Sequence, residues 1–277
     1  MENHPEIVYL PWDRPILTTA VDWLLAEQGD GVPELGECLL LLHTRQAGRR
    51  LREALAWACK ERGGIFPPRT ATPFHLLQSA SPHVASEVAC IGHWVQVLEG
   101  KILEKCPALF PRLPEQRDFT WRRKMAESLH ALRGTLLERE WDCAQVAASE
   151  HCQEEPLRWQ NLADLEAVYR KRLYKAGLQD LHDAKRKAAE APDVRGAKRV
   201  ILFSVPDSTS VIQQALLKLI EQEVQVQIVI FGPADGKALF DEWGRPMPDK
   251  WESRRLPLDD GQLIPAQDEK AQAAEVV

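Results

Sequence analysis

The fold is decided by the stretch Cys38-Leu-Leu-Leu-Leu-His-Thr-Arg-Gln-Ala-Gly-Arg-Arg-Leu-Arg-Glu-Ala-Leu55. Its first five residues are apolar without alternation, which is typical of a strand buried on both faces. Apolar residues at helical spacing follow almost at once and predict a helix over residues 46–62. A buried strand that runs directly into a helix is the repeating unit of a parallel α/β sheet.

Further strand candidates lie at residues 7–10, 69–72, 199–205 and 224–231, and helical spacing resumes after residue 16 and after residue 210. Between them, residues 84–190 show long helical patterns and no strand. We therefore expect an α/β fold in which a three-layer parallel-sheet domain carries an all-helical insertion subdomain. The expected parts are the first half of the α/β domain (1–83), the helical insertion (84–190), the second half (191–240) and a peripheral tail leading to a missing downstream domain (241–277).

The composition places broad limits on function. With 44% hydrophobic and 27% charged residues among 277, the chain is typical of a folded globular protein. Its net charge of -6 argues against a surface built entirely for nucleic acid. The polar N-terminus and the short apolar runs predict no export signal and no contact with a membrane, and hence a cytoplasmic protein.

One segment departs from this acidic balance. Residues 45–62 contain six basic and two acidic residues, a local charge of +4. Arg45, Arg49 and Arg52 recur on one side of the predicted helix, and they are either an ordinary solvated face or contacts to phosphate. The helix follows the carboxyl end of a strand, where ligands of open α/β sheets bind, and this position favours phosphate contact.

The loop after the first strand does not suit nucleotide hydrolysis. It reads Pro11-Trp-Asp-Arg-Pro15, with no glycine for close approach to phosphate and no lysine followed by serine or threonine. The six cysteines include no CxxC pair, so we predict no metal site. No local spacing indicates a catalytic triad, and we predict no cofactor and no catalytic residue.

Two segments carry a family resemblance. Residues 38–55 resemble the second conserved motif of superfamily 1 helicases, and Arg69-Thr-Ala-Thr-Pro-Phe-His75 is similar to the motif that follows, a Thr and His pair near the DNA path. Together they resemble the N-terminal part of AddB-type subunits of bacterial AddAB helicase-nucleases, which act in double-strand-break repair. The resemblance implies a P-loop-helicase-like sheet domain.

The chain departs from that family where a helicase would bind ATP. Residues 200–207 occupy the place of the metal-binding acidic strand, but they end in Pro206-Asp207 instead of paired acids. Residues 229–245 are similar to the segment that senses γ-phosphate, yet they contain no glutamine. We therefore interpret Trp12, Asp13, Arg14 and Asp207 as a degenerate nucleotide site. The alternative for Asp207 is that it is a loop or helix-capping acid ahead of Ser208 and Thr209.

The C-terminal residues resemble the start of the helix that opens a second motor domain, so we expect an N-terminal fragment of a longer protein whose nuclease lies beyond residue 277. The resulting hypothesis is an ATPase-inactive, helicase-like scaffold, not itself an enzyme, that holds single-stranded or duplex-end DNA without reading bases. The predicted DNA contacts are His43, Thr44, Arg45, Arg49, Arg52, Thr70, Thr72, Phe74 and His75.

Several alternatives remain open. The alternative for His43 and His75 is that they are packed or surface imidazoles, which is the more common role of histidine, and the alternative for Phe74 and Trp12 is that they belong to the core. The alternative for the whole chain is a docking platform for a partner helicase subunit with no DNA contact of its own, which the acidic balance favours. An α/β enzyme acting on a nucleotide or small phosphate compound is the third possibility.

Overall fold

The computed structural model describes residues 4–150, 154–233, 236–255 and 264–275. Its centre is a five-stranded, all-parallel sheet with the order β1-β5-β4-β2-β3. The expected α/β class with a parallel sheet is confirmed. The strands are β1 (Glu6–Pro11), β2 (Cys38–Leu42), β3 (Arg69–Ala71), β4 (Arg199–Phe203) and β5 (Gln225–Gly232).

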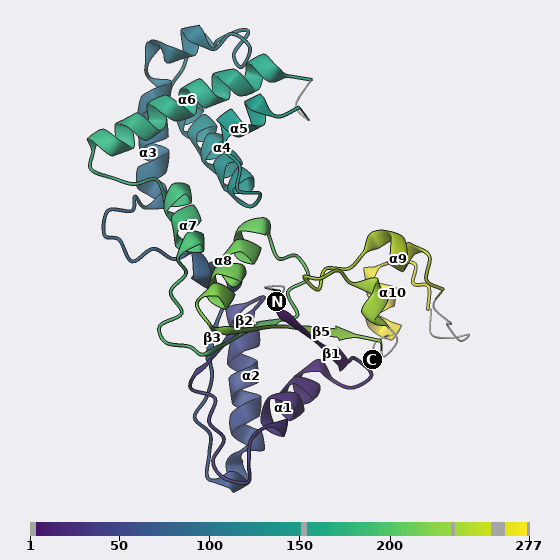
Figure 1. Cartoon of the computed structure of the whole chain (residues 1–277). Coiled ribbons are helices and arrows are strands. Elements are labelled where there is room, and N and C mark those ends of the chain that lie inside the picture. The colour runs from purple at the N-terminus through teal and green to yellow at the C-terminus, as the bar shows by residue number, and fades with distance from the viewer. Residues whose placement is uncertain (1–3, 151–153, 234–235, 256–263, 276–277) are drawn as a thin grey trace.

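Helices cover both faces of the sheet (Figure 1). Helices α1 (Ile16–Ala26) and α2 (Arg45–Ala58) pack on the face to which Leu40 and Leu42 of β2 point. Helix α8 (Ser210–Glu221) and the 3-10 helix η2 (Pro73–Leu77) pack on the other face, against Leu39 and Leu41. The uninterrupted apolar run of β2 is explained by this arrangement, because side chains on both faces of the strand are buried.

Helix α2 ends earlier than the predicted residue 62. It stops at Ala58, and a separate 3-10 helix, η1 (Lys60–Arg62), continues to Gly63, whose φ of +84° is the left-handed conformation that glycine adopts without strain. The buried face of α2 includes Gly48, where an added Cβ would lie 2.9 Å from Cβ of Thr70. The missing side chain therefore lets α2 approach β3 closely.

The insertion between β3 and β4 has its own hydrophobic core. There Trp94 stacks on Tyr169 with ring centroids 4.1 Å apart. Figure 1 shows most of this part standing away from the sheet, with its last helix, over residues 181–190, next to α8. Its elements are α3 (Glu87–Leu98), the 3-10 helix η3 (Lys101–Lys105), α4 (Phe119–Leu137), α5 (Cys143–Ala148), α6 (Pro156–Lys175) and α7 (Leu181–Glu190).

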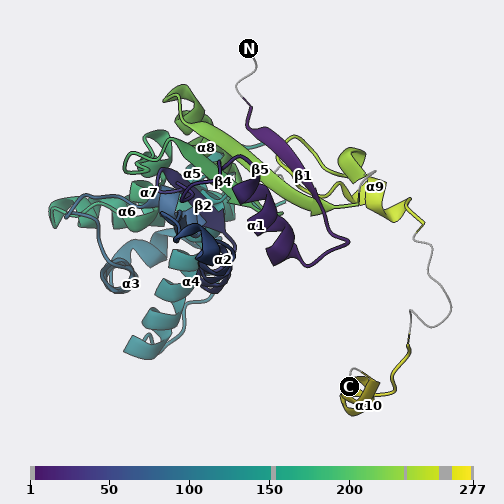
Figure 2. The same ribbon diagram turned by 90° about the horizontal axis from the view of Figure 1, so that it is seen from below.

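The start of the region expected to be a peripheral tail packs against the edge of the sheet formed by β1 and β5, and Figure 2 shows α9 beside the ends of these two strands. Trp243 is buried in the same core cluster as α8. Gly244 has φ +73°, and an added Cβ would lie 2.9 Å from the Ile230 side chain, so glycine is required at this turn. The elements here are η4 (Gly236–Leu239), α9 (Pro248–Glu252) and α10 (Glu269–Glu275).

Parts of two expectations fall outside the described residues. The segment 229–245, similar to a γ-phosphate sensor, includes residues 234–235, and the acidic tail includes residues 256–263 and 276–277. None of the helices in the described part of the chain is long and apolar enough to span a bilayer.

Candidate functional site

A groove of about 510 Å³ runs along β3, at the edge of the sheet. We call it the sheet-edge groove. The structure brings together here six of the nine residues predicted to contact DNA, and places three of them elsewhere. The groove is lined by Leu39, Thr44, Arg45, Gly48, Arg52, Arg69, Thr70, Ala71, Thr72, His75, Gln78 and Arg195.

Local structure explains why these residues converge. Thr44 follows β2 and caps α2, its hydroxyl accepting a hydrogen bond from the N–H of Ala47 at 3.1 Å. The first turns of α2 therefore begin at the carboxyl end of the sheet, beside β3. After β3, Pro73 begins η2, so that the chain turns and places His75 at the same groove. In the described residues β3 pairs only with β2, and its outer edge has no strand partner.

The groove is strongly cationic. Its lining includes four arginines, Arg45, Arg52, Arg69 and Arg195, and no aspartate or glutamate. Within the described part of the chain, none of these four guanidinium groups has a carboxylate oxygen within 4.0 Å. Four positive charges without local neutralisation create a potential that favours an anionic ligand.

Two of these arginines are held by the backbone around them. The guanidinium of Arg69 donates a hydrogen bond to the carbonyl of Val194 at 2.7 Å. Arg195 has φ +49°, a conformation that costs free energy for a residue with a Cβ, and its N–H donates to Oδ1 of Asp193 at 2.7 Å. The connection between α7 and β4 therefore presents Arg195 to the groove from a fixed turn.

Sequence reasoning missed Arg69 and Arg195 as site residues. The signal for Arg69 was present, because it immediately precedes Thr70 in the segment already predicted to contact DNA. Arg195 had no local signal, since the whole helical insertion separates it from β3 in the sequence.

Three predicted DNA contacts do not line the groove. Arg49 lies on the exposed side of α2 and pairs with Glu53 at 2.8 Å, as expected for a solvated helix face. His43 lines a different cavity, between α1 and α2. Phe74 is 52% exposed and does not line the groove, so the alternative that it belongs to the core is wrong.

The residues interpreted as a degenerate nucleotide site are dispersed. Trp12 is 50% exposed and packs beside Trp251, with ring centroids 6.2 Å apart, so it is not a core residue. Arg14 pairs with Asp22 at 2.9 Å, and Asp13 is exposed. Asp207 follows β4, which β5 separates from β1. The structure gives no contact that joins these four residues.

Asp207 lies in an exposed turn between β4 and α8, as the alternative of a loop acid predicts, but helix capping by Asp207 is not observed. The residue preceding α8 is Thr209, and it makes no side-chain capping bond. Asp207 is exposed, and no hydrogen bond or ion pair joins its side chain to another described residue.

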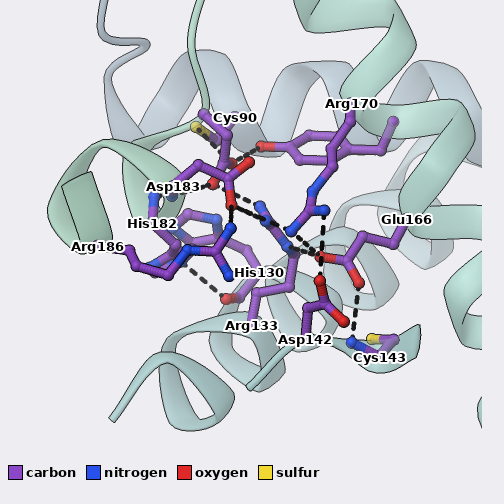
Figure 3. Close-up of polar contacts among 12 residues, drawn as sticks. Cys90, His130, Arg133, Asp142, Cys143, Glu166, Arg170, His182, Asp183 and Arg186 are labelled. Atoms are coloured by element: carbon purple, nitrogen blue, oxygen red, sulfur yellow. Dashed lines mark hydrogen bonds and ion pairs between the residues drawn. The ribbon is translucent and has the colours of Figure 1, made fainter. Parts of the chain in front are cut away.

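A second polar cluster is buried inside the helical insertion (Figure 3). Its centre is Arg133 of α4, 5% exposed, whose guanidinium lies 2.7 Å from Glu166, 2.6 Å from Asp180 and 3.1 Å from Asp183. Tyr169 donates a hydrogen bond to Asp180 at 2.6 Å. The cluster ties α4, α6 and α7 together.

Burial shapes the pKa values in this cluster. Burial by itself would raise the pKa of Asp180, but the adjacent Arg133 and the hydrogen bonds lower it to about 2. Burial lowers the pKa of His182 to about 4. The nearby Asp180 carboxylate opposes this shift, whereas His130 and Arg133 add to it. The imidazole of His182 is therefore neutral at pH 7, and its Nε2 lies 3.2 Å from the His130 carbonyl oxygen.

This cluster does not offer a cation site, because its carboxylates are already paired with arginines. The described residues contain no group of three or more histidine, cysteine, aspartate or glutamate side chains placed to hold a metal ion. The cluster is therefore an internal ion-pair network that holds α4, α6 and α7 together.

Comparisons with known proteins add no identification: no protein-family model and no curated protein sequence matches the chain.

Proposed function

We propose that the sheet-edge groove binds the sugar-phosphate backbone of single-stranded DNA, and that the chain is an ATPase-inactive, helicase-like scaffold module of a bacterial double-strand-break repair helicase-nuclease. One observation carries the proposal: four arginines and no acid line a groove in a chain of net charge -6. A polyanion is the ligand class that such a groove attracts most strongly.

The polar groups of the groove suit a phosphate backbone better than base edges. Threonine hydroxyls, arginine side chains and backbone N–H groups are the usual partners of phosphate oxygens. Thr44, Thr70 and Thr72 line the groove beside the arginines, and Gln78 is the only amide side chain in this lining. This composition supports binding that depends mainly on the phosphate backbone.

The loop after β1 supports the scaffold role. It has no glycine, and its one cation, Arg14, pairs with Asp22. A triphosphate needs several backbone N–H donors and an available lysine at this point of an α/β sheet. The residues present do not supply them, which supports a module that holds a strand without hydrolysing ATP.

The test is the affinity of the 277-residue chain for a fluorescent oligothymidylate at low salt. Arg45→Glu and Arg52→Glu should each weaken binding by about 10- to 150-fold, because a hydrogen bond to a charged group contributes about 1.5–3 kcal/mol. Each should also reduce the slope of log affinity against log salt by about 0.7. Arg49→Glu is the matched control, since Arg49 lies on the same helix outside the groove, and it should change the affinity much less.

Two results would decide against the proposal. If Arg49→Glu weakens binding as much as Arg45→Glu, the effect follows net charge and not the groove. If the unaltered chain does not bind the oligonucleotide at low salt, the docking-platform alternative is favoured, because a platform needs no DNA contact of its own.

A further inference from the structure

Two more grooves continue from the sheet-edge groove towards the helical insertion. The first, which we call the linker groove, has a volume of about 340 Å³ and shares His75, Gln78 and Arg195 with the sheet-edge groove. The second, which we call the helical groove, has a volume of about 590 Å³ and shares Gln179 and Lys187 with the linker groove. Shared lining residues make the three grooves adjoining parts of one path.

The path leads from the α/β domain onto the insertion. Its lining residues lead from β3 past α7 to the C-terminal end of α6, and Figure 1 shows the places of these three elements. A compact anion would fill the sheet-edge groove alone. A path that crosses from one core to another fits a polymer with repeating charge.

The charges along the path suit such a polymer. Lys187 of α7 is exposed, lines both outer grooves and has no carboxylate within 4.0 Å in the described part of the chain. The helical groove also contains three acids. Asp180 and Asp183 are paired with Arg133, and Asp183 is shared with Arg170, so these two carboxylates add little repulsion. Glu190 of the helical groove and Asp193 of the linker groove are exposed acids, and Lys187 and Arg195, which line the same grooves, match their charge.

The far end of the path offers an aromatic surface. Tyr174 of α6 lines the helical groove and is 82% exposed. Proteins that bind single strands combine a cationic groove with aromatic rings on which unpaired bases stack. A large, solvated ring at the end of a cationic path is the arrangement that this mode of binding uses.

We propose that a single strand of DNA runs from the sheet-edge groove through the linker groove to the helical groove, where Lys187 contacts phosphate and a base stacks on Tyr174. This inference rests on the proposed function, and it adds that the ligand is a strand several nucleotides long that contacts both the α/β domain and the helical insertion.

The test compares oligothymidylates of five and twenty nucleotides by fluorescence anisotropy. Lys187→Glu and Tyr174→Ala should each weaken binding of the 20-mer by about five- to tenfold and leave binding of the 5-mer, which fills the sheet-edge groove, unchanged. Arg45→Glu should weaken binding of both lengths. Lys171→Glu, at an exposed lysine of α6 outside these grooves, and Trp57→Ala, at a 77% exposed ring of α2, are the matched controls.

The outcomes separate the two proposals. If Arg45→Glu weakens binding but Lys187→Glu and Tyr174→Ala affect the 20-mer no more than their controls, the path onto the insertion is refuted and the sheet-edge groove stands. If neither oligonucleotide binds the unaltered chain, both proposals fail.

Discussion

Acidification should destabilise the helical insertion through His182. This side chain is 7% exposed between α4 and α7, and its pKa of about 4 lies well below the ordinary value of 6.5 because burial disfavours the imidazolium. Between these two pH values the unfolded chain binds a proton at this residue and the folded chain does not. The free energy of unfolding must therefore fall as the pH falls from 6.5 towards 4.

The magnitude follows from the two pKa values. Each unit of difference corresponds to about 1.4 kcal/mol, so His182 should remove about 2 kcal/mol between pH 7 and pH 5, and about 3 kcal/mol by pH 4. Burial also lowers the pKa of the adjacent His130, which adds to the loss in the same direction. Below pH 4, protonation of Asp180, whose pKa is about 2, removes further stability.

Urea unfolding followed by tryptophan fluorescence at pH 7, 6 and 5 measures this loss. His182→Gln removes the titrating group and keeps an N–H donor for the His130 carbonyl, so the decrease between pH 7 and 5 should shrink by about 2 kcal/mol. His83→Gln, which replaces an exposed imidazole that water surrounds in both the folded and the unfolded chain, is the control. An identical pH dependence in His182→Gln and the unaltered protein would refute the reasoning.

Two further predictions concern packing. Arg133→Leu should lower the free energy of unfolding by about 3–5 kcal/mol, because it leaves buried carboxylates unpaired. In the same urea assay, Arg123→Leu is the control, since it breaks an exposed ion pair and should lower the free energy of unfolding by less than about 1 kcal/mol. Gly48→Ala should destabilise the fold by about 1 kcal/mol and weaken oligothymidylate binding, because its Cβ would lie 2.9 Å from Thr70. Gly92→Ala is the control, because its new Cβ would meet open space, and it should stabilise α3 by up to about 1 kcal/mol. Equal effects of Gly48→Ala and Gly92→Ala on the free energy of unfolding would contradict this packing argument.

The strands and most helices could be predicted because their signals are local. The apolar run of β2 and the helical spacing that follows it identify a buried strand and an amphipathic helix within eighteen residues. The sequence predicted the end of α2 less accurately, because the apolar pattern continues to residue 59 although the α-helix ends at Ala58 and a 3-10 helix follows. The all-helical character of residues 84–190 was also visible from periodicity.

The candidate site was only partly visible in the sequence. Thr44 and Arg45 follow β2, and Thr72 and His75 follow β3, so their meeting at one end of the sheet follows from the parallel pairing of these strands. Arg49 could not be separated from Arg45 and Arg52 without knowing which side of α2 faces β3. The structure shows that Gly48 faces β3 and that Arg49 turns away to Glu53.

Residue spacing along the chain thus determined the alternation of strands and helices, the insertion and the local excess of positive charge, because each depends on neighbours a few residues apart. Only the tertiary structure decided the strand order β1-β5-β4-β2-β3, the position of Arg195 beside β3 and the continuity of the three grooves. Some of these features join residues more than a hundred positions apart, such as Glu6 and Gln227 in the sheet and Arg69 and Arg195 in the groove. Their proximity depends on how helices and strands bury their apolar faces against one another, which no local pattern records.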